Sequence, residues 1–115
     1  MATEEDLRRI ALALPETAEG RSYHGSPSWT VNGRSFLRLR TEAEGALVVF
    51  VSDLGEKQAL LEGDPDVYFT TPHYDGYPAV LVRLEAVGLD ELRELVTESW
   101  RLKAPVRARK LLDAG

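Results

Sequence analysis

An Asn32-Gly33 pair between two runs of alternating polarity constrains the fold of this chain most strongly. The preceding run covers residues 28–31 (Ser-Trp-Thr-Val), and the following run covers residues 34–40 (Arg-Ser-Phe-Leu-Arg-Leu-Arg). Asn-Gly favours a two-residue turn because both turn residues need positive φ, so the pattern predicts an antiparallel hairpin. Alternation along the second strand predicts two faces. One face holds Ser35, Leu37 and Leu39, and the other holds Arg34, Phe36, Arg38 and Arg40.

Three further runs have the composition of strands. Residues 46–51 are apolar throughout, which is typical of a central strand. Residues 67–70 form a short apolar run, and residues 79–87 form a longer one. Apolar side chains at successive positions point to both faces of a sheet, so we expect the 79–87 strand to be buried on both sides.

A helix is predicted at the N-terminus, from Thr3 to Leu14. Thr3 followed by Asp6 resembles a capping box, and apolar residues recur at helical spacing along this stretch. A proline after Leu14 ends the helix. Residues 16–27 are expected to form a connector with only a short extended piece around 21–24.

Helical spacing also predicts a short helix over 53–63 and two helices toward the C-terminus. The longest helix spans 89–103, with Gly88 as its N-cap. Pro105 separates that helix from a last one over 106–112, because proline breaks one helix and is tolerated in the first turn of the next.

The order of these elements predicts an α+β fold, in which an antiparallel sheet of about five strands carries helices on one face. The chain of 115 residues is expected to form one domain over 1–115, and 43% hydrophobic residues provide an adequate core. Cysteine is absent, which excludes disulfides and thiolate metal sites and fits a cytoplasmic location. No apolar run is long enough to span a membrane, and the acidic N-terminus lacks the pattern of a signal peptide.

Four segments together resemble the YjbR/MmcQ family of small bacterial proteins. In chain order they are residues 12–16 (Leu-Ala-Leu-Pro-Glu), the 24–29 stretch with His24 and Pro27-Ser28-Trp29, residues 71–77 (Thr-Pro-His-Tyr-Asp-Gly-Tyr), and residues 97–100 (Thr-Glu-Ser-Trp). The resemblance covers essentially the whole chain. It implies a frataxin-like (CyaY-like) fold, described as a double-wing DNA-binding arrangement, and members of the family are commonly labelled DNA-binding.

Basic residues suggest a site for a polyanion, although the net charge is −5. Rows of arginine with an aromatic neighbour hold phosphates and stack bases. We therefore predict a non-enzymatic DNA-binding protein that acts mainly through phosphate contacts. The alternative is that the C-terminal basic residues form a solvated helix that complements its own dipole, and that the arginines of the hairpin lie on a polar outer face of the sheet. The predicted contact residues are Arg34, Arg38, Arg40, Arg101, Lys103, Arg107, Arg109 and Lys110.

The loop before the last strand supports a second hypothesis, a module that binds a small molecule or a protein partner. His titrates near neutrality and Asp orients it in many sites, with tyrosine hydroxyls as further polar groups. The alternative is structural, with these side chains holding the loop on the sheet, since Asp75-Gly76 is an ordinary turn pair. The predicted pocket residues are His73, Tyr74, Asp75, Tyr77 and Trp100, although Trp29 and Trp100 are also expected in the core.

No catalytic constellation, metal site or cofactor is predicted. No nucleophile or oxyanion site accompanies His73, and 49 positions separate it from His24, the other histidine. Glu4, Glu5 and Asp6 form an acidic ridge that the frataxin-like resemblance suggests for iron, but acids in a first helical turn already stabilise the helix. The oligomeric state is left open.

Overall fold

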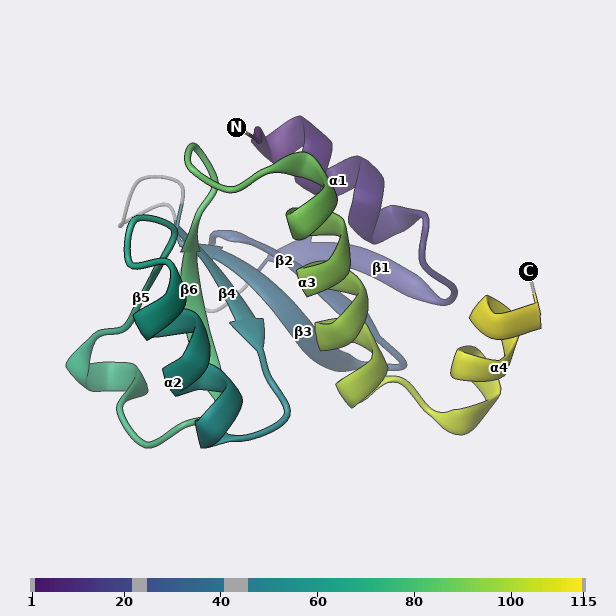
Figure 1. Cartoon of the computed structure of the whole chain (residues 1–115). Coiled ribbons are helices and arrows are strands. Elements are labelled where there is room, and N and C mark those ends of the chain that lie inside the picture. The colour runs from purple at the N-terminus through teal and green to yellow at the C-terminus, as the bar shows by residue number, and fades with distance from the viewer. Residues whose placement is uncertain (1, 22–24, 41–45, 115) are drawn as a thin grey trace.

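Six strands form a single antiparallel sheet in the order β1-β2-β3-β4-β6-β5 (Figure 1). This computed structural model describes residues 2–21, 25–40 and 46–114. The strands are β1 (Thr17–Arg21), β2 (Pro27–Val31), β3 (Arg34–Arg40), β4 (Ala46–Phe50), β5 (Tyr68–Phe69) and β6 (Ala79–Arg83). The helices are α1 (Glu4–Leu12), α2 (Leu54–Gly63), the 3-10 turn η2 (Pro72–Tyr74), α3 (Leu89–Lys103) and α4 (Val106–Ala114). The predicted α+β class is confirmed.

The predicted helices and hairpin form where the sequence placed them. Thr3 caps α1, and the reciprocal bonds with Asp6 complete the capping box. Asn32 and Gly33 have φ values of 51° and 78°, as a tight hairpin turn requires. The edge strand β1 differs from the expectation, because residues 16–27 were predicted to be a connector. Its exposed sequence Thr-Ala-Glu-Gly-Arg carries no apolar alternation, so pairing with β2 rather than burial defines this strand.

A β-bulge in β3 overturns the predicted alternation of the hairpin. Trp29 pairs with Leu37 and Thr30 pairs with Ser35, so Phe36 is the extra residue between them. Phe36 and Leu37 are consequently both buried in the same core, although strict alternation placed them on opposite faces. Side chains of directly paired residues share a face, so Arg34, opposite Val31, lies on the side of that core.

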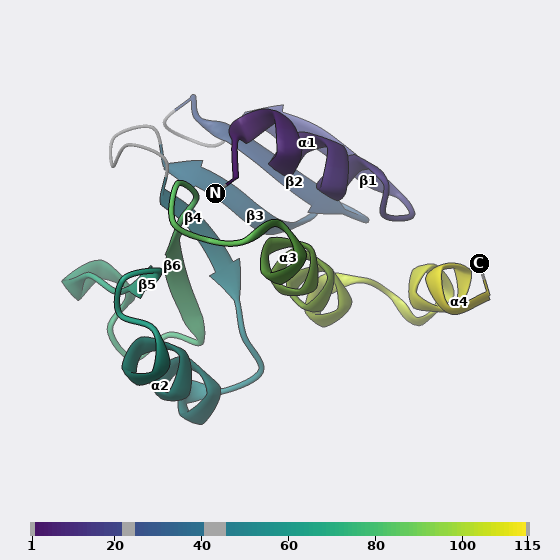
Figure 2. The same cartoon turned by 45° about the horizontal axis from the view of Figure 1, so that its top comes forward.

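Helices α1 and α3 cover one face of the sheet, which we call the helix side (Figures 1 and 2). The core between the layers includes Trp29 and Trp100, both fully buried, as predicted for each. Trp100 Nε1 donates to the carbonyl of Pro15 at 3.1 Å, which fixes α3 to the end of α1. Helix α2 lies against β5, and α4 extends away from the sheet beyond the end of α3.

Ser99 joins α3 to the sheet at the point where β3 and β4 separate. Leu37 and Val49 are the last paired residues there, and Phe36 and Phe50 occupy the next positions. The Ser99 hydroxyl accepts from Phe50 N at 2.9 Å and donates to Phe36 O at 2.6 Å. One buried side chain thus satisfies two backbone groups that would otherwise pair with each other.

Glu19 on β1 connects the first helix to the buried tryptophan of β2. Its Oε1 accepts from Arg8 Nε at 2.8 Å and from Trp29 Nε1 at 3.1 Å. The hydrogen bond from Arg8 is the main reason that the pKa of Glu19 lies below its usual value. Hydrogen bonds from arginine lower two further pKa values in the same way: Arg107 lowers the pKa of Glu16, and Arg101 lowers the pKa of Asp113.

These carboxyls predict a loss of stability in acid. A carboxyl whose pKa is lower in the folded than in the unfolded chain stabilises the fold above the unfolded pKa, and the stabilisation disappears as pH falls through the folded pKa. The free energy of unfolding is therefore expected to be nearly constant from about pH 7 to 5 and to decline below roughly pH 4.5. Urea denaturation across this range measures the decline. Glu19→Gln, which titrates no proton, is expected to make it shallower, and an unchanged slope in that variant would contradict this role of Glu19.

Candidate nucleic-acid interface

The face of the sheet opposite α1 and α3 carries no α-helix within the described residues, and we call it the open face (Figures 1 and 2). Cross-strand pairs place their side chains together on this face. Arg40 of β3 and Arg83 of β6 flank Ala46 of β4, since both pair with it. Two strand spacings separate the arginines by roughly 10 Å.

Aromatic side chains lie among the cations of the open face. The Arg83 guanidinium carbon sits 4.2 Å from the centroid of the Phe69 ring, and Lys103 Nζ sits 4.2 Å from that of Phe50. Both are cation–π contacts, which hold the charges on the sheet and keep the long side chains ordered. Arg38 Nη2 donates to the Tyr74 hydroxyl at 3.2 Å. The open face thus carries three cations and three aromatic rings: Arg38, Arg40, Arg83, Phe50, Phe69 and Tyr74. Lys103 reaches its edge at Phe50 from the C-terminal end of α3.

The loop 70–78 folds back onto this surface and is anchored by a buried lysine. Lys57 of α2 is 6% exposed, and its Nζ donates to the carbonyls of Tyr74 at 2.6 Å and Tyr77 at 3.0 Å. Gly76 permits the turn between them, at a φ of 81°. The anchored loop encloses a cavity of about 270 Å³ lined by Phe50, His73, Tyr74, Tyr77 and Ala79.

Replacing Lys57 with methionine is expected to release this loop while preserving the packing of α2. The methionine keeps the approximate volume but removes the ammonium that bonds both carbonyls, so we expect a loss of about 2 kcal/mol in unfolding free energy. Amide exchange over 70–78 is expected to accelerate more than exchange in β6. The exposed neighbour Gln58→Met serves as the control, and equal protection of the loop in both variants would show that Lys57 does not anchor it.

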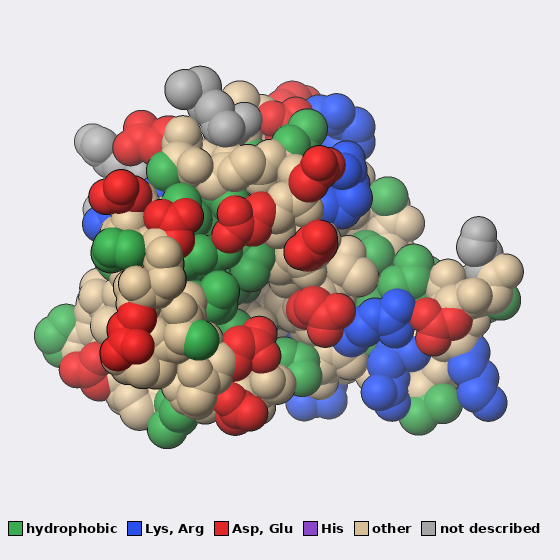
Figure 3. All heavy atoms as spheres, viewed as in Figure 1, with side chains coloured by type: hydrophobic (Ala, Val, Ile, Leu, Met, Phe, Trp, Pro, Cys, Tyr) green, Lys and Arg blue, Asp and Glu red, His purple; other side chains and the backbone are tan. Residues whose placement is uncertain are grey.

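Acidic and basic side chains are distributed unequally between the two sides of the sheet. The strand positions that face the open side hold no Asp or Glu within the described residues. The helix side carries many, and Figure 3 shows their concentration over α2 and α3. This separation lets a chain of net charge −5 present a basic surface to a polyanion.

The structure brings only part of the predicted DNA-contact set together. Arg38 and Arg40 lie on the open face, and Lys103 of α3 reaches its edge at Phe50. The bulge places Arg34 on the helix side, which corrects the prediction for that residue. The C-terminal cations are interleaved with carboxylates (Figure 3). Arg101 pairs with Asp113 at 2.8 Å and Arg107 pairs with Glu16 at 2.6 Å, while Arg109 and Lys110 lie on α4.

The predicted pocket is also present in part. His73, Tyr74 and Tyr77 line the cavity, with the His73 and Tyr74 rings edge to face at 4.8 Å between centroids. Trp100 was placed wrongly in this pocket, because it is fully buried on the helix side of the sheet. Asp75 is exposed in the loop and is not among the lining residues. His24 lies outside the described residues.

Lys57, Arg83 and the two phenylalanines of this surface were not predicted as site residues. Arg83 was recognisable, since it follows Ala79 and Leu81 on one face of its strand. Lys57 also had a signal, because a lysine three and four positions before Leu60 and Leu61 lies on the apolar side of a helix. Burial of a lysine on such a side implies acceptors nearby.

The acidic first turn of α1 is occupied by ion pairs. Arg8 binds Glu4 and Glu5, each at 3.0 Å, and Asp6 bonds back to the cap residue Thr3 and pairs with Arg9 at 2.5 Å. Within the described ranges, His, Asp and Glu side chains form no group of three or more with the geometry to hold a metal ion.

Comparison with known proteins places the chain in a family. A family model described as YjbR matches residues 12–102. The uncharacterized proteins Rv2570 of Mycobacterium tuberculosis and Mb2600 of Mycobacterium bovis are each 44% identical over 122 residues, covering 91% of this chain and 91% of their own length. The crystal structure of the Deinococcus radiodurans protein DR2400, with a DUF419 domain, aligns with a TM-score of 0.79 at 23% identity. That alignment covers 98% of this chain and 89% of the other, and shows a shared fold.

The helices add one further observation, since none in the described part of the chain is both long and apolar enough to cross a bilayer. The match of the YjbR model extends from the end of α1 almost to the end of α3 and so includes the whole sheet and the loop 70–78. By this match and by its mycobacterial relatives, the chain belongs to the YjbR family.

Proposed function

We propose that this protein is a non-enzymatic, cytoplasmic nucleic-acid-binding protein whose binding surface is the open face of the sheet. The observation that carries the proposal is the convergence of Arg38, Arg40, Arg83 and Lys103 on a face whose described strand positions hold no carboxylate. Phosphate contacts by several cations acting together provide most of the affinity of such surfaces.

The shape and chemistry of the face favour a single strand over a duplex. The open face itself presents neither an α-helix nor a protruding ribbon for entry into a groove. A flat sheet with aromatic and guanidinium groups instead suits unpaired bases, which stack on rings and guanidinium planes. Tyr77 is 61% exposed at the edge of the face and offers a ring that no cation covers among the described contacts.

Fluorescence anisotropy with labelled oligonucleotides tests the proposal. Single-stranded DNA or RNA is expected to bind more tightly than the duplex of the same sequence, with little sequence preference. Four phosphate contacts predict that log K falls with log salt at a slope of about −3. Failure of every oligonucleotide to bind at low salt would remove the proposal, and tighter binding of the duplex would assign the interaction to another surface.

The cavity beneath the loop 70–78 supports a second candidate function, the binding of a small planar ligand. Its volume of about 270 Å³ is just below the range of roughly 300–1,000 Å³ typical of ligand pockets, and rings line it from Phe50, His73 and Tyr74. A thermal-shift series with nucleosides and other aromatic metabolites tests this function. A stabilising compound is expected to lose its effect in His73→Ala and to keep it in the exposed control Asp75→Ala.

A further inference from the structure

A groove with an apolar floor and an acidic rim lies between α2 and α3, on the helix side, and adjoins the proposed interface only at Phe50. Its volume is about 210 Å³. Leu60 and Leu95 belong to the floor, beside Tyr68, whose hydroxyl is hydrogen-bonded to Glu91. In Figure 3 an apolar patch is visible between the two helices with acidic side chains on both sides. An apolar groove with one sign of charge around it selects partners of the opposite sign.

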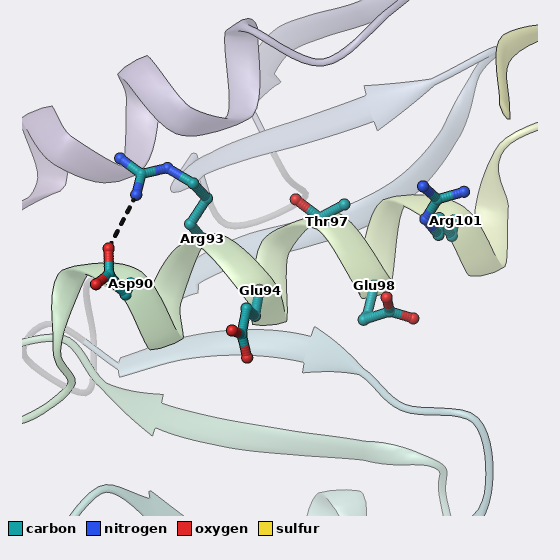
Figure 4. A pocket seen from close by; sticks show the side chains of 6 residues that line it. All are labelled: Asp90, Arg93, Glu94, Thr97, Glu98 and Arg101. Atoms are coloured by element: carbon teal, nitrogen blue, oxygen red, sulfur yellow. Dashed lines mark hydrogen bonds and ion pairs between the residues drawn. The ribbon is translucent and has the colours of Figure 1, made fainter. Parts of the chain in front are cut away.

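The acidic rim results from a separation of charges along α3. Figure 4 shows Glu94 and Glu98 projecting from one side of the helix, while Arg93 projects from the other side toward α1. Arg101, at the far end of α3, pairs with Asp113 of α4. Glu94 and Glu98 line both the groove and a shallow depression along the outer surface of α3. Glu56 of α2 adds a carboxylate from the opposite wall of the groove.

Helix α4 of the same chain has the complementary surface. Its inner side is packed through Ala108, which is fully buried, and through the partly buried Leu112. Its outer side exposes 56% of Val106 and 54% of Leu111. Lys110 falls on the same arc of the helix as those two apolar side chains, at the spacing of 3.6 residues per turn. Arg107 lies on this arc too, but it is already paired with Glu16 of its own chain. The outer side of α4 is therefore basic and apolar.

Helix α4 lies away from the groove of its own chain. Arg107 pairs with Glu16, which follows α1, and Arg101 pairs with Asp113, so α4 is held on the side of α3 that faces α1. The groove opens on the opposite side of α3, toward α2. We propose that the groove between α2 and α3 receives the outer side of α4 from a second copy of this chain.

The contact is expected to be weak and reversible. A helix of nine residues covers less surface than the roughly 1,000 Å² that a stable interface buries. If each of two copies places its α4 in the groove of the other, the two equivalent contacts are related by a two-fold axis and the assembly closes as a dimer. Association is expected at protein concentrations of about 10 to 100 µM or more.

Sedimentation velocity over a concentration series tests the proposal. The weight-average sedimentation coefficient of the natural chain is expected to rise with concentration and to fall back when salt screens the charges. The groove variant Glu94→Lys/Glu98→Lys and the helix variant Val106→Glu/Lys110→Glu, which keeps the Arg107–Glu16 pair, are each expected to remain monomeric. An equimolar mixture of the two is expected to associate again, because each supplies the surface that the other lacks. A natural chain that stays monomeric to 1 mM, the top of the series, would overturn the proposal.

Two controls separate the specific contact from a change in net charge. Asp66→Lys/Glu85→Lys alters the net charge as much as the groove variant but at exposed positions outside the groove, so it is expected to associate like the natural chain. Val106→Gln/Leu111→Gln leaves the charge unchanged and is expected to be monomeric. Association that follows net charge alone, with the Gln variant unaffected, would contradict docking of α4. Circular dichroism of each variant verifies that the fold is intact.

Discussion

Replacing Ser99 with alanine is expected to lower the free energy of unfolding by about 3 kcal/mol. The hydroxyl accepts from Phe50 N and donates to Phe36 O at the point where β3 and β4 diverge, and the residue is fully buried. Alanine leaves both backbone groups without that partner in an environment that water does not reach. Each unpaired buried group costs about 1–3 kcal/mol, and the small lost volume adds little.

Urea denaturation measures this loss as a lower midpoint at an unchanged slope. Thr97→Ala, two positions earlier on the same helix, removes a partly exposed hydroxyl and is expected to change stability by less than about 0.5 kcal/mol. Ser99→Thr keeps the hydroxyl and is expected to lie between the two. A loss for Ser99→Ala no greater than that of Thr97→Ala would mean that the two strands pair directly once the side chain is shortened.

Removing three cations from the open face is expected to weaken single-strand binding by roughly 100-fold. The variant Arg40→Ala/Arg83→Ala/Lys103→Ala deletes three phosphate contacts worth about 1 kcal/mol each at an anionic surface. The three losses in binding free energy add, which lowers the affinity by roughly 100-fold. The salt dependence is also expected to fall, by about 0.7 unit of slope for each contact. Arg38 is retained because it also bonds Tyr74 and so supports the loop.

A matched variant on the other side of the protein decides whether position or total charge matters. Arg93→Ala/Arg101→Ala/Arg107→Ala removes the same number of charges from α3 and α4, where the side chains already pair with Asp90, Asp113 and Glu16. Its affinity is expected to change less than about threefold. Equal losses in the two triple variants would show that binding follows net charge and not the open face.

Local signals were sufficient to predict the fold of this chain. The helix cap at Thr3 and the Asn32-Gly33 turn depend on hydrogen bonds and dihedral angles within a few residues, so the sequence around them determines them. Continuous apolar runs likewise identified β4 and β6. The strand β1 escaped prediction because its pairing partner, and not its own exposed residues, makes it a strand.

The candidate site was less predictable because it depends on contacts between distant segments. Arg107 looked like a phosphate ligand in the sequence, but its partner Glu16 is 91 positions away. Trp100 follows the helical period of α3 into the core, and no local pattern distinguishes that core from a pocket on the other side of the sheet. Phe36 is similar, since a bulge depends on how two strands pair and leaves no mark in either strand alone.

Because of the bulge at Phe36, the number of residues in β3 relative to β2 determines which side chains lie on each face of the sheet. Ser35 and Arg34, which precede the bulge in β3, lie on the opposite faces of the sheet from those that strict alternation predicts. Arg34 is the charged side chain of the two. Deletion of Phe36 alone would restore the regular alternation of β3 but leave Arg34 opposite Val31, on the helix side. One residue inserted into β2 opposite Phe36 would instead bring Arg34 to the open face, where Arg38 and Arg40 lie, although no amino acid had been substituted. In related chains, an insertion or deletion within this hairpin can therefore make the open face more or less basic. A comparison of residue types alone does not detect such a change.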